Sequence, residues 1–209
     1  MIARAGRSPA TLLGVLALIG FTVASGCVRS DPARYYVLTE VPRSTAATPA
    51  VGSGPPATVG VGPVSLPGYL DRIQIVTRRG AQLEVAEFDR WGEPLSDGVP
   101  RTIAAYLADL LQTDRVVVFP WPLGRTIDHQ VMVDVTRFDG VVGGDVRLEA
   151  RWRLLGQDRK ELALRWFAAR EATGESGYPA LVAAMNRSLG ALSREIADSL
   201  KTLRTQPAR

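Results

Sequence analysis

Two neighbouring segments of the chain, residues 129–140 and 144–156, alternate between apolar and polar positions. Their alternating apolar residues are Val131, Val133, Val135, Val146, Leu148, Ala150, Trp152 and Leu154. The other face of the second segment is charged from Asp145 to Arg153. Strict alternation predicts strands, and a strand with one charged face belongs to a sheet that is covered on one side only.

Two further segments repeat their apolar residues at helical spacing. Residues 95–114 have a stripe made of Val99, Ile103, Tyr106, Leu107, Leu110 and Leu111. Ser96 or Asp97 can cap this helix, and Pro100 fits its first turn. Residues 177–203 have a second stripe, made of Leu181, Met185, Leu189, Leu192, Ile196 and Leu200. We expect these segments to be the two main helices.

Shorter apolar runs predict the remaining strands. They lie at residues 34–41, 58–67, 115–120 and 161–172. Residues 69–91 predict a hairpin, with Ile73 and Ile75 on one face of its first strand and Leu83 and Val85 on one face of its second. The order is therefore strands, helix, strands, helix. This order predicts an α+β, two-layer domain in which a largely antiparallel sheet packs against two main helices.

The amino terminus has the pattern of an export signal. Two arginines precede an apolar run at residues 11–24, which is shorter than the ~20 residues of a membrane-spanning helix. Two small residues then precede Cys27, the only cysteine of the chain. This stretch resembles the lipobox of bacterial lipoproteins, which implies that residues 1–26 are removed and that Cys27 carries diacylglyceryl and acyl chains. A plain signal peptide, or an uncleaved anchor with an incidental cysteine, is the alternative.

Length and composition suit a single domain with tails. We assign residues 1–26 to the signal peptide, 27–33 to a lipidated tether, 34–203 to the domain and 204–209 to a tail. Residues 42–57 are rich in Pro, Gly, Ser and Thr and read as a flexible insert within the domain.

The inventory of reactive side chains is small. The net charge is +4, but no stripe of Lys and Arg interleaved with aromatic residues indicates nucleic-acid binding. One cysteine and one histidine exclude an intrachain disulfide and multi-histidine zinc sites. His129 begins a strand, a place more typical of a hydrogen-bonded residue than of a catalyst. We therefore expect no catalytic residue, no metal and no cofactor apart from the covalent lipid on Cys27.

Four motifs along the chain together resemble the ABC-type transport auxiliary lipoprotein family, of the PqiC type. They are Tyr35-Tyr36-x-Leu38, the set Val64, Pro67, Tyr69, Leu70 and Asp71, the set Trp91, Pro94 and Leu95, and Phe138-Asp139-Gly140. Each motif is weak alone, but their order and spacing cover nearly all of the chain after Cys27. The insert at 42–57 matches none of them.

The resemblance implies a non-enzymatic subunit of a lipid-transport system that spans the periplasm. The implied partners are an MCE-domain protein and inner-membrane permease components, and the implied task is to dock the conduit at the outer membrane and support envelope integrity. Val28, next to Cys27, suggests sorting to the outer membrane, with the inner membrane as the alternative. The resemblance also suggests a homo-oligomeric ring, because MCE conduits are themselves rings. The alternatives are a structural envelope lipoprotein without a transport role and a lipid-anchored hydrolase.

Aromatic residues supply the candidate partner interface. Trp91 and Trp121 lie in segments that contain Pro and Gly, and such tryptophans either plug a core or form an interface. Together with Tyr69 they are the residues that we expect a partner to contact.

Overall fold

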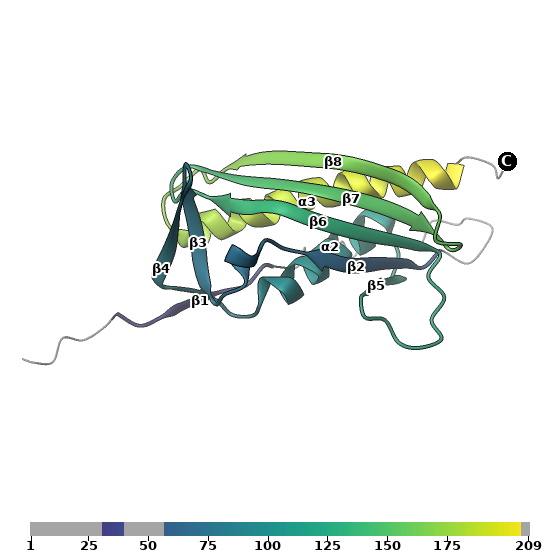
Figure 1. Cartoon of the computed structure of the whole chain (residues 1–209), viewed down its shortest axis with the longest axis horizontal. Coiled ribbons are helices and arrows are strands. Elements are labelled where there is room, and N and C mark those ends of the chain that lie inside the picture. The colour runs from purple at the N-terminus through teal and green to yellow at the C-terminus, as the bar shows by residue number, and fades with distance from the viewer. Residues whose placement is uncertain (1–30, 40–56, 206–209) are drawn as a thin grey trace, which may run out of the picture. The chain divides into compact units, whose positions relative to one another are not determined.

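The structure of the protein is a computed structural model that describes residues 31–39 and 57–205 (Figure 1). It contains two sheets, two long helices and one short 3-10 helix, η1 (Gly68–Leu70). The predicted signal peptide and Cys27, most of the 42–57 insert and the end of the tail lie outside the described residues. Within the described part of the chain, no helix combines the length and the apolar character that crossing a membrane requires.

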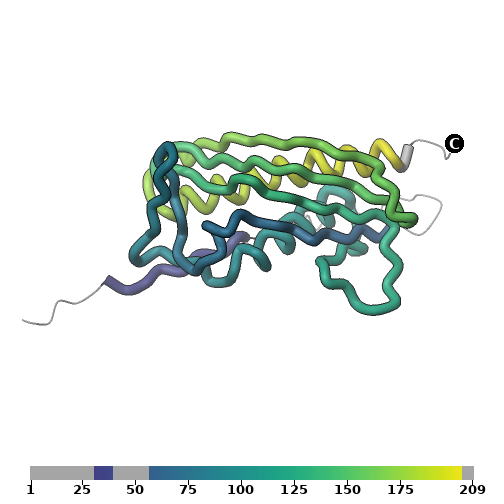
Figure 2. Tube along the Cα trace, in the orientation of Figure 1, coloured from purple at the N-terminus to yellow at the C-terminus, as the bar shows by residue number. Residues whose placement is uncertain are grey.

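The larger sheet has five strands in the order β5-β2-β6-β7-β8. Its strands are β2 (Val59–Ser65), β5 (Val116–Val118), β6 (His129–Gly140), β7 (Asp145–Gly156) and β8 (Glu161–Ala172). The long ladders β6–β7 and β7–β8 are antiparallel, whereas the short strand β2 runs parallel to both β5 and β6. Figure 2 shows the long strands lying side by side.

The strand pattern of β6 and β7 follows the sequence prediction. All eight of the predicted inward residues are buried: Val131, Val133, Val135, Val146, Leu148, Ala150, Trp152 and Leu154. The charged positions of β7 lie on the opposite face, which no helix of the described residues covers (Figure 1).

The two helices cover the other face of this sheet, as Figure 1 shows. Helix α2 (Leu95–Leu111) contacts β2, β5 and α3, while α3 (Tyr178–Thr205) contacts β6, β7 and β8. Every residue of the stripe predicted for α3 is buried, so its apolar side faces the sheet and α2. The α+β fold, with sheets packed against two helices, is thereby confirmed.

The start of α2 differs from the prediction. Pro94 occupies the N-cap position, where its carbonyl accepts hydrogen bonds from the N–H groups of Asp97 and Gly98, both at 3.0 Å. Neither Ser96 nor Asp97 is the cap, and Pro100 lies inside the helix, beyond its first turn.

The smaller sheet has the order β1-β4-β3. Strand β1 (Arg34–Tyr36) runs parallel to β4 (Gln82–Trp91), which forms the predicted hairpin with β3 (Gln74–Arg79). The hairpin faces were assigned wrongly for several residues: Ile75 is buried, but Ile73, Leu83 and Val85 are exposed, and Val76 and Ala86 are buried instead.

Candidate partner interface

The loop of residues 119–128 joins β5 to β6 and projects away from the sheet (Figure 1). Its first residue, Phe119, donates its N–H to the carbonyl of Val61 at 2.9 Å. Its last residue, Asp128, donates its N–H to the carbonyl of Thr58 at 3.0 Å and accepts the N–H of Thr58 on Oδ2 at 2.7 Å. Both ends of the loop are therefore fixed to β2 and the residue before it.

Two glycines of β2 make room for the aromatic rings of this loop. A Cβ atom on Gly60 would lie 2.9 Å from the ring of Trp121, and one on Gly62 would lie 2.7 Å from Cβ of Phe119. The two rings meet edge to face, with 5.2 Å between their centroids. Any side chain larger than hydrogen at Gly60 would collide with Trp121, so the absence of a side chain there allows the loop to pack close to the strand.

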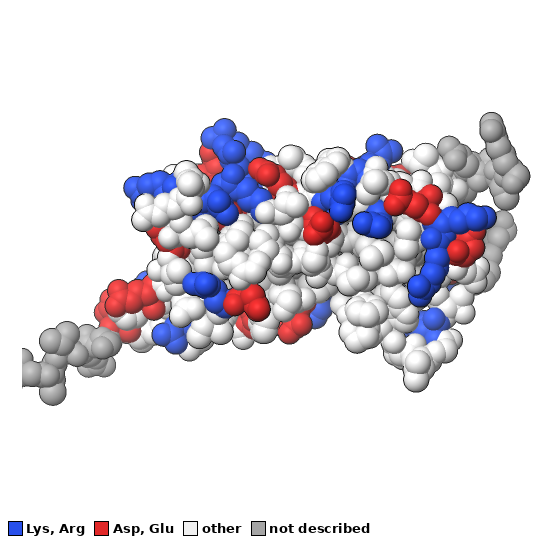
Figure 3. All heavy atoms as spheres, viewed as in Figure 1, with Lys and Arg blue, Asp and Glu red and all other residues white. Residues whose placement is uncertain are grey.

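The tip of the loop is apolar and open to solvent. Leu123 is fully exposed, and Pro120 and Pro122 are exposed beside it. A turn closes the tip, since Arg125 donates its N–H to the carbonyl of Pro122 at 3.3 Å. The surface in this part of the view, at the lower right of Figure 3, is mostly uncharged. Phe119 is exposed on the same loop, so the loop presents several neighbouring apolar side chains, and such a patch is suited to contact another molecule.

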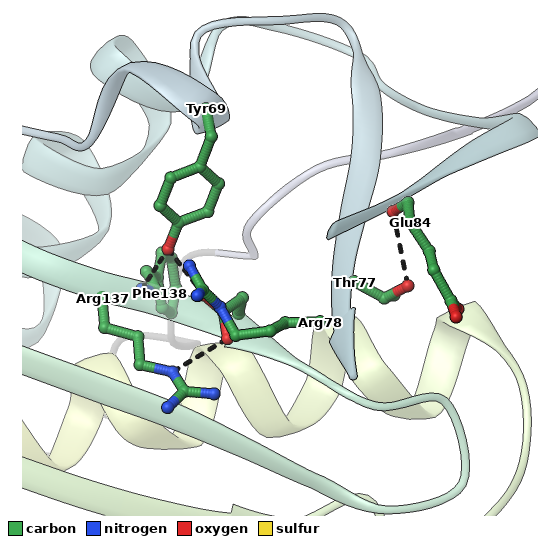
Figure 4. A network of polar contacts seen from close by, with 7 residues as sticks. Tyr69, Thr77, Arg78, Glu84, Arg137 and Phe138 are labelled. Carbon is green, nitrogen blue, oxygen red and sulfur yellow. Dashed lines mark hydrogen bonds and ion pairs between the residues drawn. The ribbon is translucent and has the colours of Figure 1, made fainter. Parts of the chain in front are cut away.

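Tyr69 lies in a different place, in a polar network that joins three parts of the fold (Figure 4). Its hydroxyl donates to Oδ2 of Asp139 at 2.6 Å. Arg78 donates through Nε to the same oxygen at 2.9 Å, and Arg137 donates through Nε to Oδ1 at 2.9 Å. The Arg78 guanidinium also lies 5.0 Å from the centre of the Tyr69 ring.

The carboxylate of Asp139 is completely buried, and these three donors satisfy it. Burial, followed by the hydrogen bond to Asp139, raises the pKa of Tyr69 above its usual value. The network connects η1 and β3 to β6, so it holds the smaller sheet against the larger one. Sequence reasoning missed Asp139 as a central residue, although the Phe138-Asp139-Gly140 motif marks its position.

Trp91 is only 4% exposed, and its ring forms part of the core. Of the three predicted interface residues, Tyr69 and Trp121 are half-buried, and Tyr69 is engaged with Asp139. The structure does not bring the three into one surface. The 119–128 loop is the part of this prediction that a partner can reach, and the interface itself stays a prediction.

His129, the one histidine of the sequence, opens β6, and its backbone N–H donates to the carbonyl of Thr58 at 3.2 Å. Within residues 31–39 and 57–205, no three His, Cys, Asp or Glu side chains gather into a group that could hold a metal ion.

Residues 36–197 match the family of ABC-type transport auxiliary lipoprotein components. The chain belongs to this family. The match spans both sheets and most of α3, so the domain described above is the domain of the family. A search of curated proteins finds no significant match.

Solved structures share the fold of this family member. A crystal structure of an uncharacterized protein is 24% identical, covers 81% of this chain and 99% of its own, and superposes with a TM-score of 0.66. Protein XCC0632 from Xanthomonas campestris is 18% identical, covers 83% of this chain and 100% of its own, and has a TM-score of 0.61. At these identities the likeness shows the fold alone.

Proposed function

We propose that this lipoprotein is a non-enzymatic subunit of an MCE-type, ABC-linked lipid-transport system, in which it docks the periplasmic conduit at the outer membrane. Membership of the transport auxiliary family supports a role beside a transporter. The lipobox-like sequence before Cys27 supports attachment to a membrane. Through this docking, the protein supports the integrity of the envelope.

The placement of the loop supports a docking role. The chain enters the folded domain at β1, where Arg34 forms a bidentate pair with Asp89, with both N–O distances at 2.8 Å. Figure 1 shows β1 and the 119–128 loop toward opposite ends of the sheet. A tether of residues 27–33 spans at most about 25 Å when fully extended. A domain held at β1 by this tether can present the loop away from the membrane, where a conduit arrives.

The observation that carries the proposal is the full exposure of Leu123 on a loop whose two ends, and Trp121 near its start, lie against β2 and the residue before it. Apolar and aromatic anchors on a preorganised segment contribute most of the affinity in protein interfaces. The occupant that we propose is an apolar pocket of the MCE-domain protein, with the permease components attached to the complex through that protein.

The proposal is tested by co-purification from crosslinked, detergent-solubilised membranes. We expect the unaltered protein to recover an MCE-domain protein, and Leu123→Asp to lose most of it, because the charge cannot enter an apolar pocket. Leu83→Asp is the matched control, since Leu83 is an exposed leucine on the β3–β4 hairpin at the other end of the sheet. This control should recover the partner normally.

The outcomes separate the function from its site. If both variants recovered the MCE-domain protein equally, the loop would not be part of the interface, but the proposed transport role would be unaffected. If the unaltered protein recovers no MCE-domain protein in repeated crosslinked preparations, the transport role is wrong. The alternative is then a structural envelope lipoprotein with no transport role.

A further inference from the structure

The last strand of the larger sheet, β8, has a free edge. It pairs with β7 on one side, and the strand order ends with it on the other. None of its 12 residues is buried. Figure 1 shows no described element beyond it. Its outer backbone N–H and C=O groups are therefore available to another strand.

This edge lacks several of the features that usually prevent strand pairing. Proteins protect such edges with prolines, bulges, very short strands or charged side chains, and β8 carries charged side chains at Glu161, Arg165, Arg170 and Glu171. Strand β8 contains no proline, and its only register shift against β7 lies at its beginning, near Glu161. Leu162, Leu164 and Trp166 are exposed on it, with Trp166 at 70%. A long, regular and partly apolar edge is a template for a further strand.

We propose that β8 pairs antiparallel with β8 of a second copy of this chain, centred on Ala168. The two-fold axis of such a pair is perpendicular to the sheet, so the helices of both copies lie on the same face. The two five-stranded sheets become one continuous sheet, and both free edges at β8 disappear.

The choice of a second copy follows from the charges along β8. Centring on Ala168 places Arg165 of each copy opposite Glu171 of the other. Both residues belong to the helix side of the sheet, because Arg165 pairs in register with Trp152 and Glu171 with Val146, and both of those are buried. Glu171 already pairs with Arg187 of its own α3, at 3.4 Å between Nε and Oε2, so Arg165 of the other copy would be its second cation. The pairing therefore adds two cross-strand ion pairs on one face.

The outer face is self-complementary in the same register. Trp166 of each copy lies opposite Arg170 of the other. Trp166 already has an arginine on its β7 side, since the Arg151 guanidinium lies 5.6 Å from its ring centre. Its other side faces the free edge, and Arg170 of the second copy, whose guanidinium also pairs with Asp145 of its own chain, would fill that position with a second cation–π contact.

Nearby registers lack this match. Centring on Trp166 places Glu161 of one copy opposite Glu171 of the other, so that like charges meet. Centring on Arg165 places this arginine opposite itself. Among these registers, the one centred on Ala168 combines opposite charges with pairing along most of the strand.

Cysteine crosslinking of the full chain tests the register. Ala168→Cys places the two new thiols directly opposite each other, within the Cα separation that a disulfide allows. Ala172→Cys is the control, because it lies on the same face of β8 but its two copies would be about 27 Å apart along the strands. We expect a disulfide-linked dimer for Ala168→Cys, in excess of the dimer formed by the unaltered chain, and no such excess for Ala172→Cys.

Charge reversal tests the pairing without a new covalent bond. Arg165→Glu alone, or Glu171→Arg alone, should weaken self-association about tenfold, measured by analytical ultracentrifugation in detergent. The double variant Arg165→Glu/Glu171→Arg should restore it, because the opposite charges meet again. A loss of folding caused by either single change would not be reversed in this way.

Several results would overturn the proposal. They are equal crosslinking at positions 168 and 172, a chain that stays monomeric, and a double variant as weak as the single ones. Crosslinking of position 168 to a different protein would assign the edge to that protein. A larger assembly supports the pairing if position 168 still crosslinks within it, and contradicts the pairing if it does not.

Discussion

At the scale of single residues, Asp139 is the position where one substitution should cost the most. Its carboxylate is completely buried between two arginines and the Tyr69 hydroxyl. Asp139→Asn removes the charge and leaves both guanidinium groups without their counter-ion. We expect a loss of about 3 kcal/mol in the free energy of unfolding, measured by urea titration.

The control for this substitution is Asp71→Asn, which makes the same chemical change at an exposed position and should be nearly neutral. Tyr69→Phe removes only one hydrogen bond to the carboxylate, so its cost should be smaller, about 1.5 kcal/mol. If Asp139→Asn were as mild as the control, the network would not be what holds the two sheets together.

The pKa of Asp89 determines how the attachment of β1 to β4 should depend on pH. The hydrogen bonds from Arg34 lower the pKa of Asp89, and the Tyr36 hydroxyl also donates to it, at 2.8 Å. A lowered folded-state pKa contributes stability above the unfolded value of about 4, and this stability is lost as the pH falls through the folded-state pKa.

We therefore expect the unfolding free energy to decrease as the pH is lowered past about 4. Asp89→Asn should be less stable at pH 7, and its unfolding free energy should change less with pH in this acid range. Urea titrations at a series of pH values measure both. If the unfolding free energies of the two proteins decreased equally with falling pH, the Arg34–Asp89 pair would not be a source of the pH dependence.

Residue roles were the part of the site that sequence reasoning resolved least. Trp91 and Trp121 look alike in sequence, since both lie near Pro and Gly, yet one is in the core and the other is half-buried on a loop. Asp139 and Tyr69 are 70 positions apart, so their contact depends on how the two sheets meet. Local patterns contain no information about such a contact.

At the scale of elements, sequence periodicity predicts the long strands and the long C-terminal helix well. The alternation of β6 and β7 and the stripe of α3 persist over enough residues to fix which face is buried. The hairpin faces were wrong because β3 and β4 form a small sheet with an irregular register between Gln74 and Val76, which shifts the buried face. Pro100 was placed too early, because the helix begins at Leu95 without a side-chain cap.

The contact between β2 and the 119–128 loop gives a prediction for a glycine. Gly60→Ala places a Cβ atom 2.9 Å from the Trp121 ring and 3.0 Å from Ile127, so the loop must move. We expect a loss of about 1–3 kcal/mol in unfolding free energy. Tryptophan fluorescence should shift to the red as Trp121 becomes more exposed.

Gly68→Ala is the matched control, because no atom lies within 4 Å of a Cβ at that position. It should change neither stability nor fluorescence appreciably. Gly60→Ala should also reduce recovery of the partner in the co-purification assay. Normal stability and fluorescence in Gly60→Ala would show that the loop is not held by its contact with β2.

At the scale of the whole molecule, the α+β class follows from the order of elements, but the strand order does not. Strand β2 is inserted between β5 and β6, which follow it by more than 50 positions. Its parallel pairing joins segments that are far apart in the sequence, and burial of its apolar residues beneath α2 favours this pairing. This pairing is what places the 119–128 loop beside β2, and thus creates the candidate interface.

The anchor and the fold should be separable, and Cys27 tests this. In the described part of the chain the buried apolar residues begin at Leu38, so the core of the described domain is built from residues that follow Cys27 by more than ten positions. Cys27→Ser should therefore abolish labelling by radioactive palmitate and leave the thermal unfolding midpoint of the domain unchanged. It should also leave an unprocessed or a soluble form of the protein, because the variant lacks the acyl chains that stable anchoring requires.

Combining this change with the loop variant separates tethering from recognition. Cys27→Ser retains the 119–128 loop, so purified protein should still bind the partner in solution. Leu123→Asp should take up palmitate normally but fail to bind. Palmitate labelling that persists in Cys27→Ser would contradict the lipobox interpretation. Loss of partner binding by Cys27→Ser in solution would show that the acyl chains, rather than the loop, form the contact.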